Sequence, residues 1–181
     1  MAGIPWWTSD IGGFIGGQVD DPAFRELLVR WFQWACFCPV FRMHGERSPW
    51  YEREQEYIGD VRQLTSGQAN EVWSFGDEVY EILRKYLFVR ERMRPYIREV
   101  MRAAHEHGDP VMRPLFYGFP ADKAAWHVED AYLFGADVLV APVLEAGARV
   151  RDVYLPAGAD WMDAATGAEY AGCIRTTDID I

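Results

Sequence analysis

The fold is decided by the stretch Trp6-Trp7-Thr8-Ser9-Asp10-Ile11-Gly12-Gly13-Phe14, which joins an apolar run to a glycine pair through one carboxylate. The apolar residues Ile4, Trp6 and Trp7 predict a short buried strand within residues 1–8. The glycines predict a loop over residues 9–19, because glycine adopts backbone φ values that other residues avoid. Asp10 therefore falls where a strand ends and a loop begins.

Two interpretations of Asp10 follow from this setting. The first is a sugar site, because aromatic faces stack on the C–H faces of a pyranose while a carboxylate accepts hydrogen bonds from its hydroxyls. The second is a local turn cap with the aromatic residues in the core, because Asp commonly caps turns. Spacing alone favours the turn cap.

A helix and a second strand are predicted next. Asp21-Pro22 predicts a helix start, because the carboxylate accepts from free amide groups and proline suits the first turn. An apolar stripe at intervals of three and four residues continues the helix; its members are Phe24, Leu27, Leu28, Trp31, Phe32 and Ala35. The apolar run Cys36–Phe41 contains a proline and indicates the helix end, followed by a short buried strand. Arg42 and His44 come at the end of that strand, where alternate residues share a face.

Metal and nucleotide sites are disfavoured. Cys36, Cys38 and His44 do not match a structural zinc site, which usually needs four ligands and Cys-x₂₋₄-Cys spacing. We therefore expect ordinary buried thiols, and His44 without further context reads as an ordinary surface or core histidine. The glycines of residues 12–17 lack the Gly-Lys-Ser/Thr of a phosphate loop, so nucleotide binding is not indicated.

The remaining sequence divides into an irregular, a helical and a β-rich part. Residues 46–77 are polar and predict a long loop that helps to wall the site. Residues 78–104 predict one long amphipathic helix that is kinked at Pro95 and ends near Gly108. Arg90-Glu91-Arg92 would lie on its solvated face. After Asp109-Pro110, short apolar runs predict an antiparallel sandwich, with strands at 115–117, 138–140 and 150–155 and a short helix within 124–134. Two strand–helix units cannot cover both faces of a parallel sheet, so residues 1–109 read as an incomplete α/β domain.

The composition argues against several classes of function and partner. The 181 residues are 50% hydrophobic and 15% aromatic, which is ample for a core. A formal net charge of −10 argues against nucleic acid and anionic membranes as partners, because both require clustered Lys and Arg. The sequence contains no membrane span and no N-terminal signal pattern, which predicts a cytoplasmic location. Three cysteines do not indicate a disulfide scaffold.

The opening stretch also carries a resemblance. Together with Phe41-Arg42-Met43-His44-Gly45, it resembles the late part of the catalytic domain of glycoside hydrolase family 31, a family of α-glucosidases, α-xylosidases and α-transglucosidases. Further blocks follow in family order over nearly the whole chain: Asn70–Gly76, Arg92–Tyr96, Val111–Phe116 and Tyr132–Val143. The resemblance implies an α/β fold in which residues 1–109 are the last two β/α units of a (β/α)₈ TIM barrel. Residues 110–181 would then begin the antiparallel β-sandwich that follows the barrel.

The same resemblance implies roles for four residues around a nonreducing sugar. Asp10 and His44 would bind its hydroxyls, Phe14 would pack against its ring, and Arg42 would hold carboxylates in place. The Trp6-Trp7 pair would support them from within. The family's nucleophile and acid/base aspartates would both lie upstream of this chain, so none of its residues is a catalytic candidate. No metal or organic cofactor is implied, because acetal cleavage by paired carboxylates needs none.

Two functions are therefore expected. In the first, the chain is a fragment of a retaining α-glycosidase that hydrolyses terminal α-linked oligosaccharides or glycosides, and it is inactive by itself. In the second, it is a noncatalytic carbohydrate-binding or assembly module of a split or decaying barrel. Open strand edges and unmatched apolar faces favour association, either as a homo-oligomer or with a partner chain.

Overall fold

The computed structural model describes residues 3–14, 16–45, 57–58, 61–62, 69–172 and 174–180, of which 57–58, 61–62 and 174–180 are described as backbone only. These residues fall into two compact units, one of Trp6–Arg94 and one that combines Met1–Pro5 with Pro95–Ile181. The predicted loop over residues 46–77 lies mostly outside the described residues. Its described parts are the antiparallel pair β1 (Tyr57–Ile58) and β2 (Val61–Arg62) and the residues from 69 onward.

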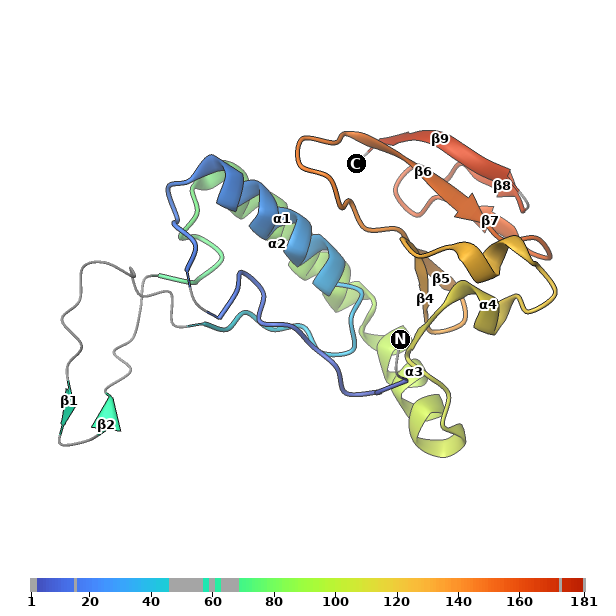
Figure 1. The fold of residues 1–181 in the computed structure, drawn as a ribbon, viewed down its shortest axis with the longest axis horizontal. Coiled ribbons are helices and arrows are strands. Elements are labelled where there is room, and N and C mark those ends of the chain that lie inside the picture. The colour runs from blue at the N-terminus through green and yellow to red at the C-terminus, as the bar shows by residue number, and fades with distance from the viewer. Residues whose placement is uncertain are drawn as a thin grey trace. The chain divides into compact units, whose positions relative to one another are not determined.

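Helix α1 (Pro22–Ala35) forms where the sequence predicts it (Figure 1). The carboxylate of Asp21 accepts a hydrogen bond from the Ala23 amide at 2.9 Å, and Pro22 occupies the first turn. The predicted stripe supplies the buried residues Leu28, Phe32 and Ala35. Leu27, at the margin of that stripe, is 53% exposed.

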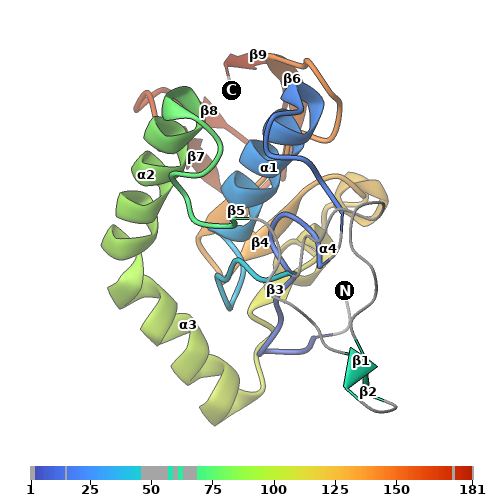
Figure 2. The ribbon, with the colours of Figure 1, turned by 90° about the vertical axis from the view of Figure 1, so that its left-hand side faces the viewer.

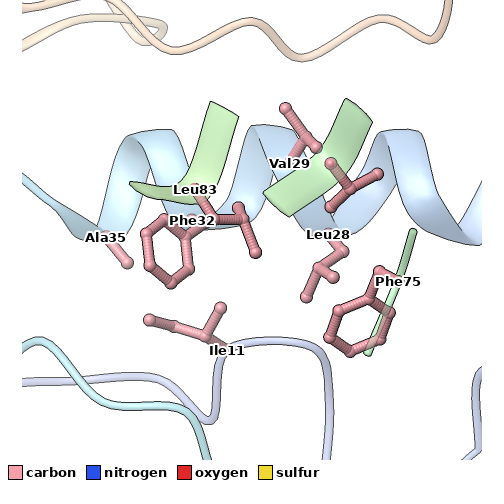
Figure 3. Close-up of a cluster of buried hydrophobic side chains, with 8 residues drawn as sticks. Ile11, Leu28, Val29, Phe32, Ala35, Phe75 and Leu83 are labelled. Carbon is pink, nitrogen blue, oxygen red and sulfur yellow. The ribbon is translucent and has the colours of Figure 1, made fainter. Parts of the chain in front are cut away.

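Helix α2 (Asp77–Arg92) lies beside α1 and runs in the same direction (Figure 1). Phe24 packs against Phe75 where the two helices begin, and Arg90 contacts the backbone that follows α1 where they end. Val79 and Leu83 of α2 join the core of this unit. Figure 3 shows Phe32 and Leu28 pointing from α1 toward Ile11, which is fully buried beneath the helix. Ile11 therefore anchors the opening stretch to the helix pair.

The two predicted strands of this unit are reduced to a single parallel bridge between Ile11 and Met43. The prediction of a buried strand within residues 1–8 is wrong, since Ile4 is 56% and Trp6 74% exposed. Two described backbone hydrogen bonds join the segments, from the Val40 amide to the Trp7 carbonyl at 3.1 Å and from the Ile11 amide to the Arg42 carbonyl at 3.3 Å. This spacing is too sparse for a regular ladder. The parallel direction and the alternation of extended segment and helix are nevertheless those of consecutive β/α units.

The predicted single helix over residues 78–104 is wrong, because α2 ends at Arg92 and a separate helix, α3 (Arg94–His107), begins two residues later. Pro95 is the second residue of α3. Its missing N–H is tolerated in a first turn, so the proline begins a new helix instead of kinking an old one. The predicted helix end near Gly108 is confirmed, since this glycine has a φ of 75° and its amide reaches the Ala104 carbonyl at 3.1 Å.

The C-terminal part of the chain is built from short antiparallel pairs. Strand β4 (Tyr132–Phe134) pairs with β3 (Met112–Arg113) on one side and β5 (Val138–Val140) on the other. The remaining pairs are β6 (Val150–Leu155) with β9 (Ile174–Asp180), seen together in Figure 2, and β7 (Asp160–Met162) with β8 (Glu169–Ala171). The strands predicted at 138–140 and 150–155 are confirmed.

Two predictions in this region are wrong in whole or in part. Residues 115–117 belong to a helical turn, α4 (Leu115–Gly118), which follows the extended Pro114 and is closed by the Phe119 amide bonding to the Leu115 carbonyl. The helix predicted within 124–134 is confined to η1 (Ala124–His127), because Tyr132–Phe134 is a fully buried central strand. Among the described residues, no helix has the length and apolar character needed to cross a bilayer.

Candidate functional site

The four residues predicted for the site meet in two pairs around the Ile11–Met43 bridge. Directly before the bridge, Oδ1 of Asp10 accepts a hydrogen bond from Nη2 of Arg42 at 2.8 Å. The Asp10 side chain is 29% exposed and the Arg42 side chain is 51% exposed, so both also reach solvent. This contact joins residues that lie 32 positions apart, and it depends on the register that the parallel bridge sets.

The second pair lies after the bridge, three residues on from Ile11 and one residue on from Met43. The rings of Phe14 and His44 are 5.6 Å apart between centroids and tilted by 46°. Phe14 is 48% exposed, so part of its ring remains open to solvent. Gly45 lets the two segments approach, since a Cβ built there would lie 2.9 Å from the Phe14 carbonyl oxygen and 3.2 Å from its Cα.

The glycine pair turns the chain immediately after Asp10, as predicted. Gly12 and Gly13 have φ values of 89° and 85°, and the Gly13 amide bonds to the Asp10 carbonyl at 2.7 Å. The turn therefore uses the backbone oxygen of Asp10. Its carboxylate bonds to Arg42 instead, which does not fit the turn-cap interpretation.

Two helix residues hold these segments in place through hydrogen bonds. The sequence predicted other roles for both of them. Trp31, predicted only as part of the apolar stripe, donates from Nε1 to the Ser9 hydroxyl at 2.7 Å and so fixes the residue before Asp10. Arg90, predicted on a solvated face, is half-buried and donates to the carbonyls of Cys36, Cys38 and Pro39. The end of α1 could have indicated this role for Arg90. Carbonyls there lack intrahelical partners and proline supplies no amide, so a donor from another element is needed.

The tryptophan pair supports the site only in part. Trp7 packs edge-on against Trp34 with centroids 5.5 Å apart, whereas Trp6 is 74% exposed. The buried thiols are as predicted for Cys36 and Cys38. Burial raises the pKa of the Cys36 thiol to about 11, although the nearby Arg90 charge acts in the opposite direction. Cys36 is therefore neutral at physiological pH.

The chemistry available at the two pairs is that of polar recognition. Asp10 offers further carboxylate lone pairs beyond the one used by Arg42, and His44 has one ring nitrogen that donates and one that accepts when it is neutral. The exposed Phe14 ring adds an apolar surface beside them. Such a set suits a ligand whose ring carries hydroxyl groups at its edge and has an apolar face.

Comparison with known proteins places the chain in a family. Residues 1–100 match the profile of the glycosyl hydrolases family 31 TIM-barrel domain, and residues 108–181 match that of the family's C-terminal domain. The chain belongs to glycoside hydrolase family 31. Its fold is thus a part of the family's TIM barrel followed by a C-terminal domain with antiparallel strands. The boundary between the two domains, which the sequence predicts between residues 109 and 110, stays a prediction.

Three relatives illustrate this membership. A family 31 α-xylosidase from a soil metagenome, solved with xylose, is 55% identical with a TM-score of 0.91 over 98% of this chain and 26% of its own. A Flavobacterium johnsoniae dextranase, solved with glucose, is 36% identical with a TM-score of 0.79 over 98% of this chain and 20% of its own. An α-xylosidase of Saccharolobus solfataricus is 34% identical over 95% of this chain and 21% of its own length. The chain thus spans about a fifth to a quarter of these relatives.

Proposed function

We propose that this chain supplies part of the sugar-binding wall of a retaining family 31 α-glycosidase that hydrolyses terminal α-linked sugars, of the α-xyloside or α-glucoside type. The observation that carries the proposal is the meeting of Asp10 with Arg42 and of Phe14 with His44 on either side of one parallel bridge. Relatives named as α-xylosidases and α-glucosidases support the substrate class.

Each side chain has a role that its contacts support. Asp10 and His44 bind hydroxyls of the nonreducing sugar, and the open part of the Phe14 ring packs against its apolar face. Arg42 holds the Asp10 carboxylate in a fixed direction, which the 2.8 Å ion pair supports. A carboxylate oriented in advance loses less entropy when a hydroxyl binds it.

The reactive acids are proposed to lie elsewhere in the enzyme. Retaining glycosidases need two carboxylates about 5 to 5.5 Å apart, one as nucleophile and one as acid/base. We place both in barrel strands that precede residue 1, residues 1–109 in the last two β/α units, and residues 110–181 in the start of the sandwich. The parallel bridge and the parallel helices α1 and α2 support two consecutive units. A cytoplasmic location remains part of this proposal.

The first test is turnover by the isolated chain. Because the proposed nucleophile and acid/base are absent, p-nitrophenyl α-xyloside and α-glucoside should release no p-nitrophenol above a buffer control. Saturation-transfer NMR on the same sample should still detect contact with xylose or glucose. Measurable turnover would show that the catalytic pair lies within residues 1–181.

The second test is Asp10→Asn in a polypeptide that joins this chain to the upstream part of a family 31 barrel. We expect kcat/KM to fall by about tenfold or more, because a site built to bond a hydroxyl loses heavily when its acceptor is altered. Asp20→Asn is the matched control, since Asp20 is 93% exposed and pairs with Arg25 only at 3.4 Å. Steady-state rates for Asp10→Asn equal to those of the control would remove Asp10 from the site.

A second candidate is a noncatalytic carbohydrate-binding or assembly module. The exposure of Trp6 and Trp73, at 74% and 68%, favours a covering partner in the unit Trp6–Arg94. Reading the DNA upstream discriminates the two functions. An in-frame continuation that encodes the remaining barrel supports the glycosidase, whereas a promoter and a stop codon support the module.

A further inference from the structure

Arg90 grips the backbone between α1 and the site. One of its guanidinium nitrogens, Nη1, donates to the carbonyls of Cys36 and Cys38 at 2.7 Å each, and Nη2 donates to that of Pro39 at 2.8 Å. The guanidinium also lies 5.7 Å from the centroid of the Phe41 ring. A single side chain from the last turn of α2 thus contacts four residues of one connecting segment.

The physical need for this grip comes from the end of α1. The last carbonyls of a helix have no intrahelical donor, and Pro39 contributes no amide to the turn that follows. A guanidinium satisfies several of these oxygens at once, because its N–H groups form a rigid planar fork. Its charge also favours the negative end of the helix dipole.

The gripped segment leads directly into the site. Phe41 packs edge-on against Phe32 of α1, with centroids 4.6 Å apart, and the Val40 amide bonds to the Trp7 carbonyl. Arg42 and His44 are the next polar residues along the chain. A shift of residues 36–39 along α1 would therefore be passed on to both of them.

We propose that Arg90 is a positioning residue for the site: its grip on residues 36–39 sets the register of residues 40–44 against residues 7–11. This register places the Arg42 guanidinium on Asp10 and the His44 ring against Phe14. The inference rests on the proposed function for the meaning of the site, but its geometric consequence is measurable without any sugar.

The experiment compares three variants of the full chain by NMR. Arg90→Lys keeps the charge but replaces the planar fork with a point charge, so the nuclear Overhauser effect between the Phe14 and His44 rings should weaken about twofold or more. Arg84→Lys is the matched control, because Arg84 lies on the same helix and its described ion pair is with the exposed Glu81. Val79→Ala lowers stability through the core at the other end of the helix pair, and it should leave the ring contact unchanged.

The outcomes separate positioning from general stability and from sugar binding. A ring contact that is unchanged in Arg90→Lys, or weakened equally in Val79→Ala, overturns the proposal. The Arg90→Lys chain should bind xylose more weakly than the wild-type chain does. If the wild-type chain binds no sugar, the proposed function fails while the ring contact still decides the role of Arg90.

A fourth variant tests the role of Arg90 if Arg90→Lys does not fold. Phe41→Leu removes the ring beside the guanidinium and leaves the three carbonyl bonds in place. The proposal then expects the Phe14–His44 contact to persist. Loss of that contact while the Arg90 Nη resonances stay unchanged would show that packing of Phe41, and not the grip on the carbonyls, positions the site.

Discussion

The unit Trp6–Arg94 and the unit that contains Pro95–Ile181 differ in how much they depend on apolar packing and on side-chain hydrogen bonds. In the first, two helices and the opening stretch share one buried apolar cluster, in which Ile11, Phe32 and Phe75 are at most 1% exposed (Figure 3). The burial of each such large side chain stabilises the folded state by about 2 kcal/mol. The polar site lies at the margin of this cluster, where Asp10 comes directly before the buried Ile11 and the glycine turn.

The second unit has a smaller apolar cluster of Leu115, Ala125, Ala131 and Leu133, and polar side chains connect the short elements around it. Tyr96 of α3 donates to the Phe134 carbonyl at 2.8 Å and accepts from the Asp137 amide at 3.1 Å. Asp122 accepts from the Tyr154 hydroxyl at 2.7 Å and from the Ala157 amide at 2.9 Å. The comparison teaches that the helix-rich unit depends on the larger buried apolar cluster, whereas the strand-rich unit adds directed hydrogen bonds between short elements around a smaller one.

The largest expected effect tests the apolar half of this comparison. Phe32→Ala should lower the free energy of unfolding of the unit Trp6–Arg94 by about 3 to 5 kcal/mol, because it opens a cavity between α1 and Ile11. Hydrogen exchange should show lost protection in α1 and α2, with α3 and β4 little affected. Phe88→Ala is the control, since Phe88 is 53% exposed on α2 and its removal should change stability by less than about 1 kcal/mol. Equal loss of protection in both units would mean that they do not depend on separate cores.

The same contrast explains what the sequence could and could not predict. Helix α1 was predictable because Asp21-Pro22 and the 3.6-residue stripe act locally, and the turn after Asp10 was predictable because Gly12 and Gly13 favour it. The four site residues were chosen from the resemblance, and the structure brings them together in pairs. Their binding roles stay predictions.

The errors arise where long-range contacts decide the conformation. Residues 115–117 and 132–134 are similar apolar runs, yet only the second has strand partners on both sides and becomes a strand. Arg90 was assigned to a solvated face because charge periodicity along a helix does not show which carbonyls lie opposite. Trp6 was expected in the core because hydrophobicity alone does not say which side of the chain the neighbouring elements cover.

A smaller effect tests the polar half of the comparison. Asp122→Ala should lower stability by about 1 to 2 kcal/mol, because it leaves the Tyr154 hydroxyl and the Ala157 amide without their acceptor while water replaces part of the loss. These bonds hold the pKa of the Asp122 carboxyl below its ordinary 3.8. The stabilisation is therefore present above pH 3.8 and is lost as the pH falls through the lower pKa of the folded state.

Acid titration of the Asp122 variant checks the sign of this linkage. The difference in unfolding free energy between wild type and Asp122→Ala should shrink as the pH falls below about 4. Asp160→Ala is the control, because Asp160 is exposed on β7 and should give no comparable pH-dependent difference. A difference that stays constant through this range would show that the two hydrogen bonds do not favour the ionised carboxyl.

The last expected effect returns to the apolar unit, and at neutral pH it is the smallest of the three because it emerges only in alkali. Burial raises the pKa of the Cys36 thiol to about 11 from 9.0, so in this window the folded chain keeps a proton that the unfolded chain has lost. Stability should therefore fall as the pH rises from 9 through about 11. Tyr86, whose pKa burial also raises, titrates nearby, so the measurement is the difference between wild type and Cys36→Ala in urea unfolding. If this difference is flat with pH while an aromatic disulfide reagent labels Cys36 in the folded chain at pH 7, the thiol is solvated and the core is open where α1 ends.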